Sequence, residues 1–166
     1  MFMKVLGLSL LLLLTIQVQA IEVGDRLPAC NDYLQTILPS GDEVKMCVED
    51  FEQKDFLLIE FMSIYCGSCL RAMPVVNAIG NQFKAKLATH FVTLDRSEED
   101  LQQFLNEWGE QMEHPILLDK ERLTRKPYRI KYTPTSILVN SKGVVIYKHV
   151  GEFSNDDRAA LEALIK

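Results

Sequence analysis

Two cysteines with the spacing Cys-x-x-Cys, Cys66-Gly67-Ser68-Cys69, stand where a buried strand is predicted to give way to a helix. The strand is indicated by Asp55–Met62, a short and almost continuous apolar run, which is typical of a strand buried on both faces. The helix is indicated by apolar residues at helical spacing from Cys69 to Leu87, and Pro74 is expected to kink or restart it. We therefore expect a helix-covered sheet with the cysteine pair at the end of one buried strand.

The other patterns predict a single domain over residues 21–166, because no repeat or flexible linker interrupts this stretch. Ile21–Asp50 contains turn residues and predicts a β-hairpin or a loose loop. Further strands are expected at His90–Leu94, Ile116–Leu118, Thr135–Val139 and Val144–His149, and further helices from Ser97 to Trp108, over Glu121–Tyr128, and after Ser154 with Leu161, Leu164 and Ile165 inward. This order predicts an α/β fold in which a central mixed β-sheet is flanked by helices on both faces and carries an N-terminal hairpin extension.

The first twenty residues have the pattern of a targeting segment. Met1–Ala20 carries one charge, Lys4, followed by an apolar run of about a dozen residues. That run is shorter than the ~20 residues that a membrane span needs, but it suits the core of a signal peptide that ends at the small residue Ala20. We expect cleavage after Ala20 and export; an uncleaved N-terminal anchor is the alternative, and only in that case would the protein contact the membrane.

Charge narrows the range of partners. Without the leader, 17 Lys and Arg face 23 Asp and Glu, a net charge of −6 with both signs interspersed. This pattern gives no reason to expect nucleic acid or a membrane surface as a partner. Export would place the chain in an oxidising compartment, where disulfides persist.

All four cysteines lie in the predicted mature part of the chain. An even number permits two disulfides with three connectivities, and the close Cys66/Cys69 pair leaves Cys30 with Cys47. Because these two flank the turn at Pro39–Gly41, we expect a structural disulfide there, worth about 3 kcal/mol on the chain-entropy model. A second redox pair and two free thiols are the alternatives.

The position of the cysteine pair predicts redox chemistry. A thiol at a helix N-terminus faces unpaired N–H groups and the positive end of the helix dipole, which favour the attacking thiolate. Gly67 and Ser68 have small side chains that leave the first sulfur approachable. Half of a zinc site and an inert bridge are the alternatives, but no second paired spacing among the other cysteines and the three histidines supplies two more ligands. We expect no metal and no other cofactor.

An ordered set of motifs extends over nearly all of the predicted mature chain, from Val23 to Leu164. The motifs are Val23-Gly24-Asp25, Phe61 to Pro74, Leu117-Leu118-Asp119, Tyr132-Thr133-Pro134-Thr135-Ser136, Gly143 and Gly151. Together they resemble the thioredoxin superfamily, and within it the exported TlpA/ResA-like thiol–disulfide oxidoreductases. The resemblance implies a thioredoxin-like fold and an enzyme, a protein-disulfide oxidoreductase.

The resemblance also implies roles for individual residues. Cys66 is the nucleophile, and Cys69 is the resolving thiol. Thr133 and Pro134 match the loop whose proline is cis and faces the cysteines, and in the family the residue before this proline pairs with a bound substrate chain. Tyr65 replaces the usual tryptophan before the first cysteine and would keep the aromatic cover. An ordinary trans proline opening an edge strand is the alternative for Pro134.

Glu60, six residues before Cys66, matches the buried carboxylate of thioredoxin. A carboxylate in a strand buried under helices loses solvation, which raises its pKa, and no Lys or Arg lies beside it in sequence. We expect Glu60 to take the proton of Cys69 as an acid–base group. A strand-end carboxylate exposed to water is the alternative.

Three hypotheses for function follow. The first is an exported, periplasmic enzyme of bacterial origin that reduces disulfides of other exported proteins and is re-reduced by a membrane thiol electron donor. Cytochrome c biogenesis stays open, although Ala72 replaces the Glu of the cytochrome-maturation members and argues against a dedicated haem-pathway reductase. The second is a peroxidase, because Ser63-Ile64-Tyr65-Cys66 resembles the peroxiredoxin motif, although Ile59 stands where that motif wants proline. The third is a redox-inert binding or assembly module.

Overall fold

The computed structural model describes residues 20–27, 34–37, 43–46, 54–119 and 128–166. The strands are β1 (Leu34–Ile37), β2 (Glu43–Met46), β3 (Phe56–Met62), β4 (Leu87–Thr93), β5 (Ile116–Leu118), β6 (Thr135–Asn140) and β7 (Val145–Val150). The helices are α1 (Gly67–Gln82), α2 (Glu98–Trp108), the 3₁₀ turn η1 (Gly109–Gln111) and α4 (Asn155–Ile165). The α/β fold with a central mixed sheet is confirmed.

The seven strands form one sheet in the order β2-β1-β5-β4-β3-β6-β7. In the centre, β3 pairs in parallel with β4 and antiparallel with β6, and β4 pairs in parallel with β5. Helix α1 connects β3 to β4, and α2 lies between β4 and β5, because parallel neighbours need a crossover connection. The expected N-terminal hairpin is present as β1 and β2, and its antiparallel pairing with β5 makes it the edge of the main sheet.

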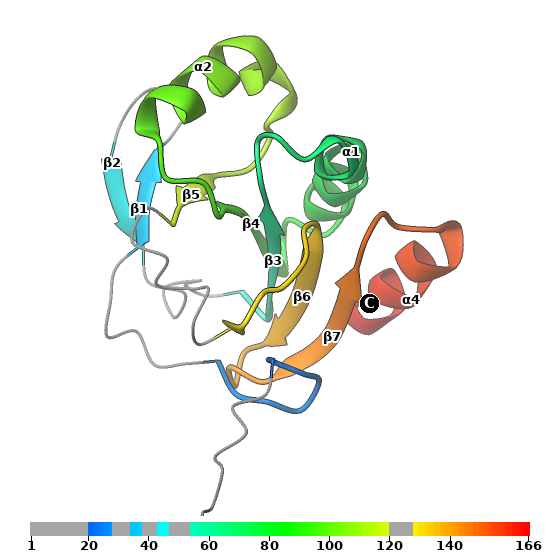
Figure 1. Ribbon diagram of the computed structural model, residues 1–166. Helices are drawn as coiled ribbons and strands as arrows, with labels where there is room; N and C mark the ends of the chain where they lie inside the picture. The colour runs from blue at the N-terminus through cyan, green and yellow to red at the C-terminus, as the bar shows by residue number, and fades with distance from the viewer. Residues whose placement is uncertain (1–19, 28–33, 38–42, 47–53, 120–127) are drawn as a thin grey trace, which may run out of the picture.

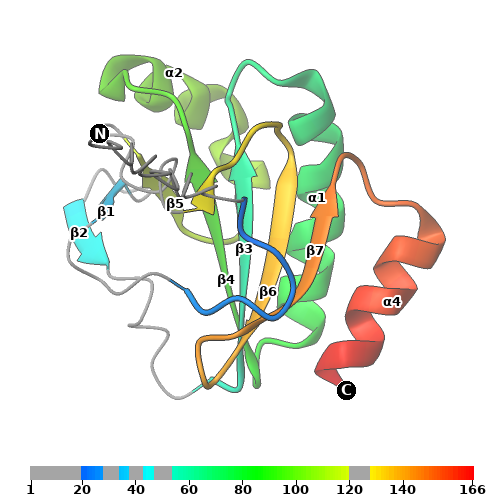
Figure 2. The ribbon, with the colours of Figure 1, turned by 60° about the horizontal axis from the view of Figure 1, so that its bottom comes forward.

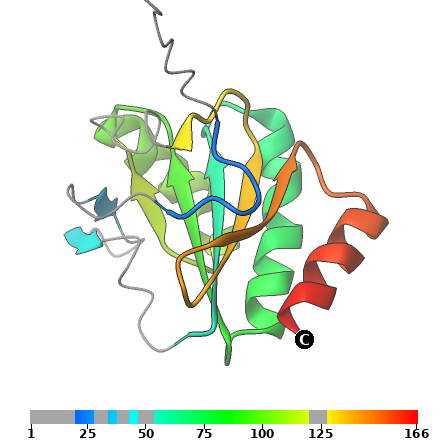
Figure 3. The same ribbon diagram turned by 90° about the horizontal axis from the view of Figure 1, so that it is seen from below.

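Different parts of the chain cover the two faces of the sheet. On one face, residues of α1, α2 and α4 pack in one cluster with strand residues such as Leu58, Phe91 and Leu138. Figure 1 shows both α1 and α4 on that flank of the sheet. On the other face, the segment 20–27, Tyr128 and Ile130 pack on the sheet. Figures 2 and 3 show the segment 20–27 crossing the sheet on the side away from α1.

Strand β3 is buried from Leu57 to Met62 because both of its faces are covered. Leu58 and Met62 belong to the cluster on the helix side, whereas Leu57 and Phe61 belong to the cluster on the opposite side. This explains why its sequence is apolar almost throughout, with Glu60 as the exception.

Polar caps begin the later helices where the sequence predicts them. The Ser97 hydroxyl accepts a hydrogen bond from the amide of Asp100 at the start of α2. Ser154 and Asp157 form a reciprocal capping box at the start of α4. The prediction that Leu164 faces inward is wrong, since this side chain is 43% exposed. Helix α4 packs against the sheet along one narrow stripe. Leu161 and Ile165, four positions apart, lie on this stripe and are buried, whereas Leu164 lies outside it.

The structure corrects the predicted range of the first helix, Cys69 to Leu87, and excludes a restart at Pro74. Helix α1 begins at Gly67, ends at Gln82 and runs as one helix through Pro74. Burial of Met73 and Val76 on either side of the proline stabilises the helix there and offsets the missing backbone hydrogen bond. Leu87 has helical spacing from the residues before it, but it is the first residue of β4.

Two predicted segments lie almost wholly outside the described residues, namely the leader Met1–Ala20 and the short helix Glu121–Tyr128. Of the helices in the described ranges, none is both long and apolar enough to cross a membrane.

Candidate active site

A disulfide between Cys66 and Cys69 lies at the junction of β3 and α1. Cys66 is the N-cap of α1, and its sulfur accepts a hydrogen bond from the amide of Cys69 at 3.2 Å. Cys66 is partly exposed, whereas Cys69 is 2% exposed and belongs to the core cluster on the helix side. Only one sulfur of the pair is therefore open to a large substrate.

Two further oxygen atoms lie near the Cys66 sulfur. The Ser68 hydroxyl is 3.2 Å away, and the carbonyl oxygen of Thr133 is 3.6 Å away. A hydroxyl at this distance can donate to a thiolate, and the helix N-terminus favours the same negative charge. The Ser68 hydroxyl and the start of α1 thus stabilise the ionised form of Cys66 when the disulfide is reduced.

The sheet brings the loop before β6 to the disulfide. Phe61 in β3 pairs with Thr135 in β6, so the residues before Thr135 lie beside the residues after β3. The Thr133–Pro134 peptide bond is cis, and Pro134 is buried, its carbonyl accepting a hydrogen bond from the amide of Gly151 at 2.9 Å. Tyr65 is 72% exposed, and Tyr132 is comparably exposed. The structure therefore places Thr133 and Pro134 beside the cysteine pair, with two exposed aromatic rings on the adjoining loops.

Asp95 holds the loop that precedes Cys66, and the sequence alone did not single it out. Its carboxylate accepts hydrogen bonds from the Ser63 hydroxyl at 2.8 Å, the Ile64 amide at 2.7 Å and the Thr93 hydroxyl at 2.6 Å. Because the Ser63 hydroxyl is directed to Asp95, the motif that resembles a peroxidase site does not place this hydroxyl on the Cys66 sulfur. The sequence did contain a signal for this role, because Asp95 directly follows the predicted strand at His90–Leu94. The carboxyl ends of parallel strands meet at one edge of a sheet, which places such a residue near the loop after the neighbouring strand.

A second link ties α1 to the loop after β7. The guanidinium of Arg71 makes a two-pronged ion pair with the Glu152 carboxylate, with a shortest distance of 2.6 Å. The ion pair raises the pKa of Arg71 and lowers the pKa of Glu152. Both side chains are exposed, so this pair orients the loop more than it stabilises the fold.

Glu60 is 1% exposed and lies in β3 on the same face as Cys69. The register places it opposite Ser136, whose hydroxyl donates to its Oε2, and its Oε1 has no hydrogen-bond partner in the described part of the chain. Burial raises the pKa of Glu60 from 4.5 to about 8, against the opposing effect of the Ser136 hydrogen bond. Glu60 is therefore protonated over much of the neutral range and can gain or lose a proton there.

Two predicted site residues, Cys30 and Cys47, lie outside the described residues. Within the described ranges, no three or more His, Cys, Asp or Glu side chains gather as a metal site would require.

The sequence pattern of the Redoxin family matches residues 22–165. The chain is 27% identical to the thioredoxin-like protein YneN of Bacillus subtilis over 140 residues, 82% of this chain and 76% of the relative. It is also 27% identical to the thiol-disulfide oxidoreductase ResA of Bacillus thuringiensis over 124 residues, 74% of this chain and 68% of the relative. A crystal structure assigned as the thiol:disulfide interchange protein DsbE of Chlorobium tepidum superposes with a TM-score of 0.69 at 27% identity, covering 88% of this chain and 96% of that one. With a Cys-x-x-Cys disulfide at the head of α1, the chain belongs to the Redoxin family of the thioredoxin superfamily and is a ResA-like thiol–disulfide oxidoreductase.

Proposed function

We propose that this protein is exported and reduces disulfides in other exported proteins. The observation that carries the proposal is the asymmetry of the cysteine pair, in which the exposed Cys66 caps a helix and the buried Cys69 lies one helical turn behind it. Export is supported by the sequence of residues 1–20, which we propose to be a signal peptide cleaved after Ala20.

In the proposed reaction the reduced protein begins with a thiolate on Cys66 and a thiol on Cys69. The Cys66 sulfur attacks one sulfur of the substrate disulfide, that bond breaks, and the other substrate sulfur leaves as a thiolate that takes a proton from water. Cys69 then loses its proton and attacks the Cys66 sulfur, which releases the second substrate thiolate and forms the Cys66–Cys69 disulfide. Two electrons pass from the protein to the substrate, and a membrane thiol protein is the proposed donor that restores the dithiol.

Three residues around the sulfurs are proposed to assist. The backbone of Thr133, beside Pro134, pairs with the substrate chain, and the ring of Tyr65 covers the bound chain. The role of Thr133 is supported by the distance of 3.6 Å between its carbonyl oxygen and the Cys66 sulfur. The ionised form of Glu60, whose share grows as pH rises toward about 8, accepts the Cys69 proton during the second step, which is supported by the burial of Glu60 and its orientation toward the same face.

The experiment is a comparison of insulin reduction with peroxide consumption by the processed protein purified after export. The proposal expects catalysed insulin reduction that is lost in Cys66→Ala, with no peroxide consumption above the rate of free dithiol. Rapid peroxide consumption without insulin reduction would instead indicate a peroxidase, and neither activity would indicate an inert module.

The direction of electron flow depends on the reduction potential, which differs by about 150 mV among proteins with this motif. Equilibration of the pair with glutathione measures it. A potential near the about −270 mV of thioredoxin fits the proposed reductase, whereas one near the about −120 mV of DsbA would make the protein an oxidant.

We also propose a structural disulfide between Cys30 and Cys47. Mass mapping of protein in which only the Cys66/Cys69 pair has been reduced should find these two linked. Two free thiols at these positions would contradict the proposal.

A further inference from the structure

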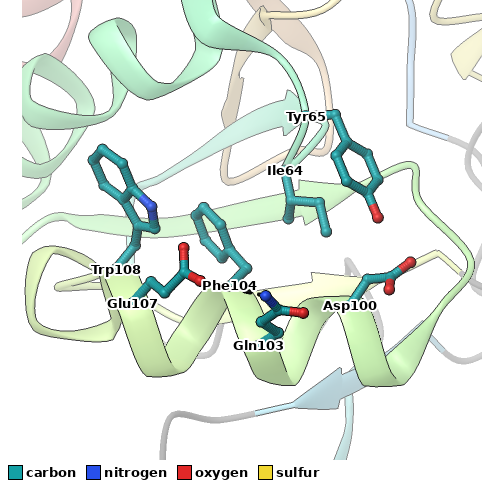
Figure 4. Close-up of a pocket in the computed structure, with 7 residues that line it drawn as sticks. All are labelled: Ile64, Tyr65, Asp100, Gln103, Phe104, Glu107 and Trp108. Atoms are coloured by element: carbon teal, nitrogen blue, oxygen red, sulfur yellow. Dashed lines mark hydrogen bonds between the residues drawn. The ribbon is translucent and has the colours of Figure 1, made fainter.

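A pocket of about 200 Å³ opens between the loop before Cys66 and helix α2 (Figure 4). Its lining residues are Ile64, Tyr65, Asp100, Gln103, Phe104, Glu107 and Trp108. Ile64 and Tyr65 immediately precede Cys66 in the chain. Because two peptide units span about 7 Å, the pocket wall begins within that distance of the Cys66 Cα atom. The volume is below the about 300 Å³ at which typical small-molecule sites begin, and it suits a single long side chain. An occupant would therefore be a side chain close to the reacting disulfide of a bound polypeptide.

The floor of the pocket is apolar and aromatic. Ile64 and Phe104 are buried, and Trp108 is half-buried beside them. The rings of Phe104 and Trp108 are stacked, with centroids 6.3 Å apart and planes 9° from parallel. Figure 4 shows these rings and Ile64 on the same side of α2. Such a surface suits the methylene stem of a long side chain or the flat face of a guanidinium group.

The rim of the pocket is acidic. Asp100 and Glu107 lie two helical turns apart on α2, and no Lys or Arg is among the residues that line the pocket. The whole of α2 carries four carboxylates, adding Glu98 and Glu99, and no cation. The Asp100 carboxylate raises the pKa of the Tyr65 hydroxyl, and so this acid lies next to the residue that precedes Cys66. An apolar floor under two carboxylates is complementary to a long cationic side chain.

We propose that this pocket is a substrate subsite for a lysine or arginine side chain within about three residues of the target cysteine, because an extended chain advances about 3.3 Å per residue. The stem of that side chain lies along Phe104 and Trp108, and its charged end lies between Asp100 and Glu107. The inference rests on the proposed function and adds the class of substrate: disulfides flanked by basic residues.

The test uses the dithiol form of the processed, exported protein and short peptides that carry one cysteine in a mixed disulfide with mercaptoethanol. Lysine, norleucine or glutamate is placed in turn at each of the three positions on either side of the cysteine. Second-order reduction rates are measured at low and high salt for the wild type, Asp100→Asn, Glu107→Gln and Glu99→Gln. Glu99→Gln is the matched control, because Glu99 is an exposed carboxylate of the same helix that does not line the pocket.

We expect at least one lysine position to give a rate about fivefold above norleucine at low salt, with glutamate slowest and the differences reduced by salt. Asp100→Asn and Glu107→Gln should each bring the lysine peptide close to the norleucine peptide, whereas Glu99→Gln should keep the full preference. Equal rates for all peptides would overturn the subsite and leave the proposed function intact. Loss of the lysine preference in Glu99→Gln as well would overturn the subsite, since the preference would then come from the overall negative charge of the protein. Failure of the wild type to reduce any peptide would count against the proposed function itself.

Discussion

At the scale of single residues, the two sulfurs differ because of where α1 begins. With Cys66 as the N-cap, its side chain receives the amide of Cys69, while Cys69 itself falls in the first turn and is buried. The same helix start therefore stabilises a thiolate on the outer cysteine and protects the inner one from solvent. The roles proposed for the two cysteines follow from this difference in position.

Ser68 gives the first prediction. Its hydroxyl lies 3.2 Å from the Cys66 sulfur, so Ser68→Ala should remove one donor to the thiolate and raise the pKa of the Cys66 thiol by about one unit. The pH dependence of alkylation by iodoacetamide in the reduced protein measures this pKa. Ser68→Thr should restore it, and Ser141→Ala, at an exposed serine in the turn after β6, should leave it unchanged. An unshifted pKa in Ser68→Ala would mean that the hydroxyl donates elsewhere in the dithiol form.

Glu60 gives the second prediction. Glu60→Gln should keep the fold and the first attack by Cys66 but slow release of the mixed disulfide by about 10- to 100-fold near neutral pH, because an amide cannot accept the Cys69 proton. Single-turnover kinetics on a model peptide disulfide resolve the two steps. Asp55→Asn, at an exposed carboxylate just before the same strand, is the control and should change neither step. A release rate that is unchanged in Glu60→Gln from pH 6 to 8 would make Glu60 a bystander.

At the scale of elements, the site depends on contacts between segments that follow different strands. Asp95, after β4, holds the loop after β3 through Ser63 and Ile64. The ion pair between Arg71 and Glu152 joins α1 to the loop after β7, which in turn donates the Gly151 amide to the carbonyl of Pro134. These contacts connect the cysteine loop and the cis-proline loop to the rest of the sheet, so the geometry around Cys66 is set by the fold as a whole.

The packing of α1 on β4 gives the third prediction. A Cβ added at Gly80 would overlap the His114 ring and lie 2.7 Å from Oγ1 of Thr89, both held against the helix. Gly80→Ala should therefore lower the free energy of unfolding by about 1–3 kcal/mol, measured by urea titration. Gly109→Ala is the control, since the added atom there meets nothing nearer than 4.0 Å at an ordinary helical φ of −59°, and it should be neutral or slightly stabilising. A fully stable Gly80→Ala would show that the histidine and threonine move aside at little cost.

Much of this architecture could be predicted from local sequence. The strand at Ile116–Leu118 and the cap at Ser97 are where the pattern predicts them, because each depends on neighbours a few residues away. Local sequence left open whether the helix restarts at Pro74, and it continues because burial against distant strands offsets the local effect of proline. The part played by Asp95 was missed as well, because it depends on which strands are adjacent, and this is a property of the sheet.

At the scale of the whole molecule, buried ionisable groups should make stability depend on pH. Between pH 4.5 and about 8 the folded protein keeps the Glu60 proton that the unfolded chain has lost, so this group lowers the free energy of unfolding as pH rises, by about 1.4 kcal/mol per unit. His90 acts in the opposite direction at lower pH. Burial lowers its pKa from 6.5 to about 4, so its contribution is complete above pH 6.5 and is lost as pH falls toward 4.

The fourth prediction follows from these opposing signs. The free energy of unfolding of the oxidised wild type should change little from about pH 4.5 to 6.5, where the two opposing slopes cancel, and should fall as pH rises from there to about 8. Glu60→Gln should lose the fall on the alkaline side and exceed the wild type most at the highest pH. Urea unfolding of both proteins from about pH 5 to pH 9 measures the two curves. An alkaline fall that persists unchanged in Glu60→Gln would mean that another group causes it.

The central claim is that Cys66 attacks the substrate disulfide and Cys69 releases it, and covalent trapping tests this most directly. Exported Cys69→Ala protein should accumulate mixed disulfides with other exported proteins, seen as reducible bands on non-reducing gels, because the attacking thiol remains and the releasing thiol is absent. Cys66→Ala should give none, since its remaining thiol at position 69 is buried. Equal trapping by Cys66→Ala, or no trapped complexes in Cys69→Ala, would contradict the account.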